Sequence, residues 1–201
     1  MKNKNSNLIV KHFQLSNQKN EYLLINGQEA ATIDVSGAYE TVSRLLKEQA
    51  LDLKFLLLTH AHKSHLQGLS PLKRRFGGTF CLYKDELGDF TESGGDLQPD
   101  KYLKDRQILE LGGIKIRVLH TPGHTNGSVC YYIKQAKALF SGSTFLKGGF
   151  GQIWGPISME RMCASLKRLS STIPDDTTIY TGSGKSTKLK YEAWINCMRS
   201  A

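Results

Sequence analysis

Two histidine-rich segments, each directly after a strand-like apolar run, constrain this 201-residue chain more than any other feature. Residues 59–65 follow the apolar run at residues 53–58 and hold three of the six histidines. Residues 120–128 follow a similar run at residues 114–119 and hold two more. Neutral imidazole is the commonest side-chain ligand of zinc-like metals. The pattern therefore predicts a metal site built on loops at the ends of buried strands.

The spacing within the first segment supports a shared site. His60 and His62 are two residues apart, so in an extended segment their side chains point to the same side. A single histidine in such a loop is usually a hydrogen-bonded surface or half-buried residue. Five of six histidines in two strand-end loops favour the metal-site hypothesis over that ordinary interpretation.

Composition narrows the class of protein. A length of 201 residues and a hydrophobic content of 39% fit one globular domain over residues 1–201. The net charge of +9 is compatible with anionic partners. The basic residues are scattered, however, apart from residues 73–75 and the group Lys185, Lys188 and Lys190. Without a recognition motif this charge indicates a solvated surface, so we expect a small-molecule substrate rather than nucleic acid.

The spacing of the cysteines and the absence of long apolar runs bear on the cellular compartment in which we expect the protein. No pair among the cysteines has the Cys-x-x-Cys spacing, and each lies among apolar neighbours: Cys81, Cys130, Cys163 and Cys197. Such residues are expected to be small buried thiols in a reducing environment. The N-terminal residues lack the apolar core of a signal peptide, and no run has the length of a membrane span. We therefore expect a cytoplasmic protein, with the oligomeric state left open.

Strand-like segments dominate the chain. They are residues 8–10, 21–25, 30–35, 53–58, 79–83, 108–111, 114–119, 129–133, 138–140 and 178–180. Asn26-Gly27 predicts a hairpin turn between the second and third of these.

Helices are expected between the strands. Residues 38–50 have a helical apolar period, and Ser70-Pro71 resembles a helix start that Gly77 would end. Ser158 is expected to cap a later helix, and a closing helix is expected to pack Tyr191, Trp194, Ile195 and Met198 on one side. Residues 84–107 are polar and contain Gly94-Gly95 and Pro99, so we expect a loop-rich excursion there. Residues 145–157 hold four glycines and are expected to form a flexible loop.

At this point the chain resembles the metallo-β-lactamase superfamily, most closely its glyoxalase II-like single-domain branch. Residues 59–65 resemble the family's Thr-His-x-His-x-Asp-His, and residues 120–128 resemble its His-Thr-Pro-Gly-His-Thr-x-Gly-Ser. Residues 140–144 resemble its strand ending in Gly-Asp-Thr, and residues 180–184 its late Gly-His-Gly. Asp34 fits its early Asp-x-Gly. The resemblance implies an α/β fold, a four-layer αββα sandwich with the metal site at one edge of the two sheets.

The departures from the family concern its second metal. The resemblance implies that His60, His62 and His124 hold the first metal ion. The second would need an aspartate where Ser64 stands, a bridging aspartate where Ser143 stands and a histidine where Ser183 stands, which leaves only His65. A serine hydroxyl is neutral and a poor ligand for a divalent ion, so we expect a vacated second site and one zinc ion per chain or none.

Two functions follow from this incomplete ligand set, and the choice between them stays open at this stage. The first is a mononuclear zinc hydrolase of a small ester, thioester or lactone, since three histidines with one open position form a catalytic zinc arrangement. The alternative is a catalytically inactive member of the fold with a binding or regulatory role. Catalytic residues are not assigned, and Phe150 and Trp154 are candidates for the substrate mouth.

Overall fold

The computed structural model describes residues 7–196, apart from the side chain of Ser64. The predicted positions of Cys197 and Met198 lie outside these residues. Within the described part of the chain, the strands form two six-stranded sheets with the orders β1-β2-β3-β4-β5-β6 and β12-β11-β10-β9-β8-β7. The first sheet therefore comes from the N-terminal half of the chain and the second sheet from the C-terminal half.

The first sheet combines an antiparallel and a parallel part. Its strands are β1 (Ile9–Gln14), β2 (Asn20–Asn26), β3 (Glu29–Ile33), β4 (Asp52–Leu57), β5 (Thr79–Tyr83) and β6 (Lys101–Leu103). The first three pair antiparallel, and β3 to β6 pair parallel. The parallel strands are connected by α1 (Tyr39–Glu48), α2 (Leu69–Phe76) and α3 (Leu87–Glu92).

The second sheet is mostly antiparallel. Its strands are β7 (Ile108–Leu111), β8 (Ile114–His120), β9 (Val129–Ile133), β10 (Ala138–Gly142), β11 (Thr178–Thr181) and β12 (Thr187–Lys188). Only β10 and β11 pair parallel among these strands as described, and the long helix α4 (Pro156–Thr172) connects them. Short 3-10 turns complete the chain: η1 (Lys63–His65), η2 (Lys84–Glu86), η3 (Lys134–Ala136), η4 (Leu189–Tyr191) and η5 (Ala193–Ile195).

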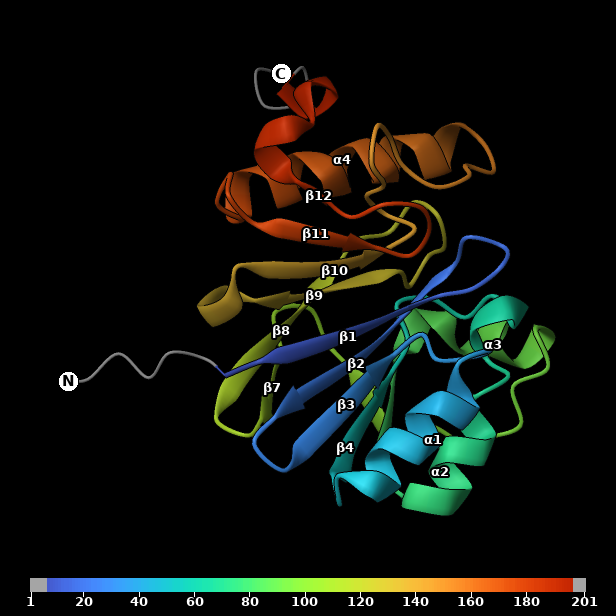
Figure 1. Cartoon of the computed structure of the whole chain (residues 1–201). Helices are drawn as coiled ribbons and strands as arrows, with labels where there is room; N and C mark the ends of the chain where they lie inside the picture. Colours follow the sequence, from blue (N-terminus) through green and yellow to red (C-terminus); the bar gives the residue numbers. More distant parts are fainter. Residues whose placement is uncertain (1–6, 197–201) are drawn as a thin grey trace.

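The layers follow from strands that are apolar on both faces. In β9, Tyr131 and Ile133 point to the first sheet, whereas Cys130 and Tyr132 point to α4. Side chains alternate along a strand, so a continuous apolar run serves two cores at once. Figure 1 shows α4 on the outside of one sheet and α1 and α2 on the outside of the other. The result is the expected four-layer αββα sandwich.

Three apolar clusters hold these layers together. The cluster between the sheets includes Phe140, while Val42 and Leu72 pack α1 and α2 on the first sheet. Met162 and Leu166 pack α4 on the second sheet. No helix in residues 7–196 is long and apolar enough to cross a membrane.

Most predicted strands are confirmed, and the Asn26-Gly27 hairpin joins β2 and β3. The loop-rich excursion expected at residues 84–107 also contains the short elements η2, α3 and β6, which the sequence did not predict. These elements are too short to produce a recognisable apolar period. The helix starts were also misplaced: α2 begins at Leu69 with Gly68 as its N-cap, and α4 begins at Pro156 rather than after Ser158.

The C-terminal segment differs from the closing helix that the sequence suggested. Residues 189–195 form two short 3-10 turns, η4 and η5, instead of one amphipathic helix. Ile195 is buried, as expected, but Tyr191 is 68% exposed and does not share its packed side.

Removing a large side chain between the sheets should be costly. Phe140 is fully buried, stacks on Tyr180 at 4.8 Å between ring centroids and meets Tyr22 edge-on at 5.2 Å. We expect Phe140→Ala to lower the free energy of unfolding by about 3–5 kcal/mol in urea denaturation. The matched control is Ile157→Ala, which truncates a 66% exposed side chain and should change stability by less than about 0.5 kcal/mol. Equal losses in both variants would contradict this account of the core.

Candidate metal centre

The two histidine segments meet because the sheets are joined at this edge. The segment after β4 accepts two hydrogen bonds from β9: the Val129 N–H donates to Thr59 O at 2.9 Å and the Tyr131 hydroxyl donates to Leu58 O at 2.7 Å. Because β9 directly follows residues 120–128, these bonds fix the second histidine segment beside the first.

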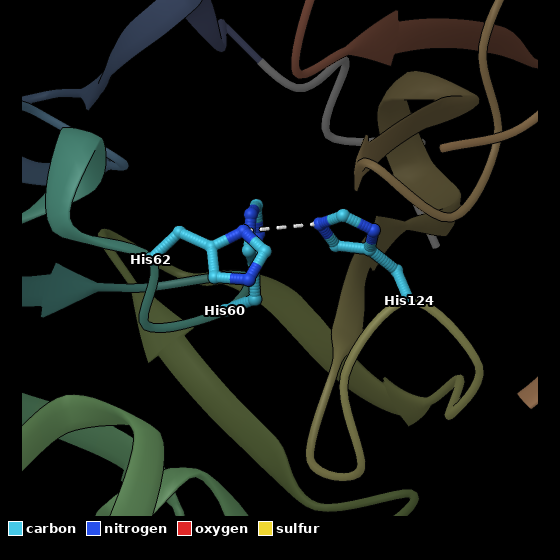
Figure 2. A group of neighbouring side chains, drawn as sticks. All are labelled: His60, His62 and His124. Atoms are coloured by element: carbon cyan, nitrogen blue, oxygen red, sulfur yellow. Dashed lines mark hydrogen bonds between the residues drawn. The ribbon is translucent and has the colours of Figure 1, made fainter. Parts of the chain in front are cut away.

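His60, His62 and His124 converge at this edge (Figure 2). One ring nitrogen from each lies within 4.8 Å of the others, and His124 Nε2 is 3.2 Å from His62 Nδ1. Nitrogen ligands of a tetrahedral metal with bonds of about 2.0 Å are about 3.3 Å apart. Small side-chain movements therefore suffice for all three to reach one ion.

A buried hydrogen-bond chain orients His60. The Thr59 N–H and the Thr59 hydroxyl donate to the Asp34 carboxylate at 2.7 and 2.6 Å. Since its proton goes to Asp34, the Thr59 hydroxyl accepts from His60 Nδ1 at 3.0 Å. His60 Nε2 then carries a free lone pair directed at the other histidines, which is how metal-ligating histidines are held.

His124 is oriented in the same way by residues 145–157. Its Nδ1 donates to Gln152 O at 2.9 Å, which leaves Nε2 as the acceptor nitrogen. The Trp154 indole donates to His124 O at 3.1 Å, so this segment holds both ends of the residue. The expected loop at residues 145–157 is therefore part of the site.

The histidines are neutral in this environment. Burial, assisted by the charges of neighbouring groups, lowers the pKa of His60 well below 6.5, and burial also lowers the pKa of His62 and His124. Neutral imidazole has a lone pair for a metal, whereas imidazolium has none. The residues present therefore fit a divalent transition metal in donor type, orientation and spacing.

Glu86 connects the two histidine segments and was missed by the sequence analysis. It is 1% exposed, and its carboxylate accepts from the Ala61 N–H at 2.7 Å and from the Gly127 N–H at 2.8 Å. Ala61 lies between two of the histidines, and Gly127 lies in the second segment. A single glutamate in a polar stretch carries no sequence signal for such a role.

The structure places three of the four residues expected around the vacated second metal site: His65, Ser143 and Ser183. His65 is buried, with its ring centroid 4.3 Å from that of His60 and its Nδ1 3.8 Å from Asp34 Oδ2. Ser143 follows β10 and Ser183 follows β11, and both are half-buried. The side chain of Ser64 is outside the described part of the structure.

The two candidate aromatic residues lie in different surroundings. Trp154 is 62% exposed and lines a pocket of about 300 Å³ with His62, His124 and Asp89. Phe150 packs on the cluster beneath α4, with its ring 6.2 Å from that of Trp194.

His120 lies apart from the three converging histidines. It stacks on Tyr83 at 4.2 Å, and its Nε2 is 2.9 Å from Asn126 O.

Comparison with known proteins gives concordant results. A family model described as metallo-beta-lactamase superfamily matches residues 17–189. The chain is 28% identical over 190 residues to the probable metallo-hydrolase YqgX of Bacillus subtilis (strain 168), covering 87% of this chain and 89% of that protein. It is 32% identical over 163 residues to the hydroxyacylglutathione hydrolase of Brucella ovis, covering 80% of this chain and 60% of that protein.

A solved structure has a similar fold. The crystal structure of TTHA1623 in a di-iron-bound form superposes with a TM-score of 0.79 at 28% identity. The match covers 92% of this chain and 97% of that one. The likeness therefore extends over almost the whole of both chains.

The buried histidines should make the metal-free protein sensitive to acid. Burial lowers the pKa of His65 from 6.5 to about 3, so between these values the unfolded chain binds a proton that the folded protein does not. Stability is therefore lost as the pH falls below 6.5. Between about pH 6.5 and 5, the free energy of unfolding should fall by about 2 kcal/mol less in His65→Gln than in the parent, measured by urea denaturation at each pH.

The variant must be compared with the parent because Asp34 changes the free energy of unfolding in the opposite direction as the pH falls. Burial raises the pKa of Asp34 from 3.8 to about 7, so its protonation stabilises the folded protein as the pH falls through this range. Asp34 is present in both proteins, and the difference between them reports mainly on His65. Identical pH profiles for the parent and His65→Gln would contradict the assignment.

Replacing Glu86 should loosen both histidine segments together. In Glu86→Gln one acceptor oxygen becomes an amide donor that faces a backbone N–H. We expect a loss of about 2–3 kcal/mol in the free energy of unfolding and weaker zinc binding in a chelator competition. Glu92→Gln, at an exposed position of α3, is the control and should change neither quantity. An unchanged zinc affinity in Glu86→Gln would remove Glu86 from the positioning of the ligands.

Proposed function

This chain belongs to the metallo-beta-lactamase superfamily, and from that premise we propose that it is a mononuclear zinc hydrolase of small esters, thioesters or lactones. The observation that carries the proposal is the convergence of His60, His62 and His124 with one ring nitrogen of each within 4.8 Å of the others. In this proposal these three residues are the metal ligands.

Hydrogen bonds within the protein orient two of the three histidines toward the position of this ion. Asp34 and Thr59 hold His60, and Gln152 O holds His124, so two of the imidazoles keep their lone pairs directed inward. A bound zinc ion supplies a Lewis acid that polarises a carbonyl group and lowers the pKa of water to about 7. The hydroxyls of Ser143 and Ser183 can donate and accept hydrogen bonds but do not act as bases near neutral pH.

The relatives and the pocket support the substrate class. A hydroxyacylglutathione hydrolase is named for cleaving a thioester, and this chain spans 60% of the length of that relative from Brucella ovis. The pocket of about 300 Å³ beside His62 and His124 is at the small end of ligand sites. A small acyl compound fits this volume better than a long polymer does.

The choice of one zinc ion rests on the three serines. Ser64, Ser143 and Ser183 are neutral, so His65 is the one good ligand that the sequence leaves for a second ion. The similar chain TTHA1623 is described in a di-iron-bound form, so iron is the natural competitor to zinc in the test.

A second candidate function follows from the same serines. Three missing ligands remove the charge that a two-metal mechanism requires, which favours a binding or regulatory protein that keeps the fold without the reaction. Metal content and turnover together separate the two functions.

Metal analysis of the purified protein tests the proposal directly. We expect one equivalent of zinc per chain, retained in His120→Ala and lost in His62→Ala and His124→Ala. His120 is the matched control because it lies in the same segment as His124 but outside the converging group. Two equivalents at full occupancy, or equal loss in His120→Ala, would contradict the assignment of the ligands.

Activity is then measured on a panel of small acyl esters, acyl thioesters and lactones. We expect the zinc-loaded parent to turn over at least one class, more slowly than a typical enzyme rate of about 10 per second because the second-site ligands are missing. Full metal loading without turnover on any class would favour the binding or regulatory function.

A further inference from the structure

The turn between β1 and β2 is attached to the segment that follows β11. Lys19 and Ser183 lie opposite each other as an antiparallel pair. The Asn20 N–H donates to Gly182 O at 2.9 Å on one side of this pair. The backbone of Lys19 is therefore held against the residue that stands where the family has its late histidine ligand.

Side chains strengthen this attachment. Asn20 Nδ2 donates to Thr181 O at 2.9 Å and to Gly184 O at 2.8 Å, and the Tyr22 hydroxyl donates to Thr181 O at 2.7 Å. Asn20 is 1% exposed and Tyr22 is 2% exposed, so these bonds are shielded from water. The turn is thus fixed to the edge of the site by buried hydrogen bonds.

The charge of Lys19 acts on the histidine site. Lys19 is half-buried, and burial lowers its pKa while the nearby Asp34 carboxylate opposes that effect. Its positive charge contributes to lowering the pKa of four histidines: His60, His62, His65 and His124. The backbone pairing of Lys19 with Ser183 and its half-buried side chain place this charge at the edge of the site.

We propose that the Lys19 ammonium takes the place of the second metal ion's charge, so that the centre accepts one metal ion and prefers substrates with an anionic group beside the reacting carbonyl. This inference rests on the proposed function, because it concerns the same metal site. The serines agree with it in one respect: Ser64, Ser143 and Ser183 are neutral, so none of them cancels a positive charge in the second position.

Simple electrostatics gives the direction of each effect. A fixed positive charge several ångströms from a divalent cation opposes its binding and opposes a second cation more strongly. The same charge attracts a substrate carboxylate, and an ammonium offers that carboxylate three donors. Removing the charge should therefore strengthen metal binding and weaken anion binding, whereas a merely structural lysine would weaken both or affect neither.

The first experiment measures zinc affinity by chelator competition in Lys19→Met and Lys19→Glu. The controls are Lys11→Met and Lys11→Glu, which remove the same charge from an exposed position of β1 in the same hairpin. We expect about tenfold tighter zinc binding in Lys19→Met, a larger gain in Lys19→Glu, and no change in the controls. Thermal melts verify that all four variants are folded.

The second experiment uses two zinc-binding thiols that differ in one carboxylate: mercaptoacetate and 2-mercaptoethanol. Both offer the metal the same thiolate, so the ratio of their affinities reports on recognition of the carboxylate. We expect the zinc-loaded parent and Lys19→Arg to prefer mercaptoacetate by about tenfold, and Lys19→Met to lose this preference. Lys11→Met should bind both thiols as the parent does.

The outcomes separate this inference from the proposed function. If the parent binds zinc but Lys19→Met matches it in zinc affinity and in thiol preference, the inference is overturned and the proposed function stands. If the parent binds no zinc and Lys19→Glu does, Lys19 is a metal-excluding charge and the proposed function fails. If no variant binds zinc, both are overturned.

Discussion

The buried Asp34 carboxylate is the group on which the first histidine of the site depends. Asp34 directly follows β3 and has a positive φ of 55°, a conformation that few residues other than glycine adopt. This backbone turn directs the carboxylate at Thr59, whose N–H and hydroxyl both donate to it. Because the hydroxyl proton is committed to Asp34, the tautomer of His60 is determined before any metal arrives.

Two tyrosine hydroxyls form hydrogen bonds between the two halves of the sandwich at the site edge. The Tyr131 hydroxyl on β9 donates to Leu58 O, just after β4 of the first sheet, and the Tyr22 hydroxyl on β2 donates to Thr181 O at the end of β11 in the second sheet. Each tyrosine buries its ring between the sheets, and its hydroxyl donates a hydrogen bond to a backbone carbonyl at the site edge. The same residues therefore provide hydrophobic burial and hold the ligand-bearing segments in place.

The local pattern of the sequence predicted most of the strands and the two histidine segments, whereas the four-layer arrangement followed from the resemblance to the family. Residues 129–133 and 138–140 are apolar throughout, which is the pattern of a strand buried on both faces, and they form β9 and β10. The choice of His60, His62 and His124 among the five histidines of these segments came from the family's motifs.

Other features depend on tertiary contacts that no local pattern records. In α3 only Phe90 is buried, so this helix has too little apolar surface for a period, and β12 has two residues. Glu86 and Lys19 are single charged residues whose roles arise from the approach of distant backbone segments. Neither could be separated from ordinary surface charges before the fold was known.

The hydrogen bonds of Glu86 have a consequence for how the protein acquires its ion. Both histidine segments are held by a protein carboxylate and by β9, not by the ion. In many small metalloproteins the free energy of metal binding is spent on folding the chain. Here the ligands are already assembled, so an ion can leave and another can enter without unfolding. The identity of the occupant is then governed by the supply of metals in the cell and by the preference of three imidazoles among them.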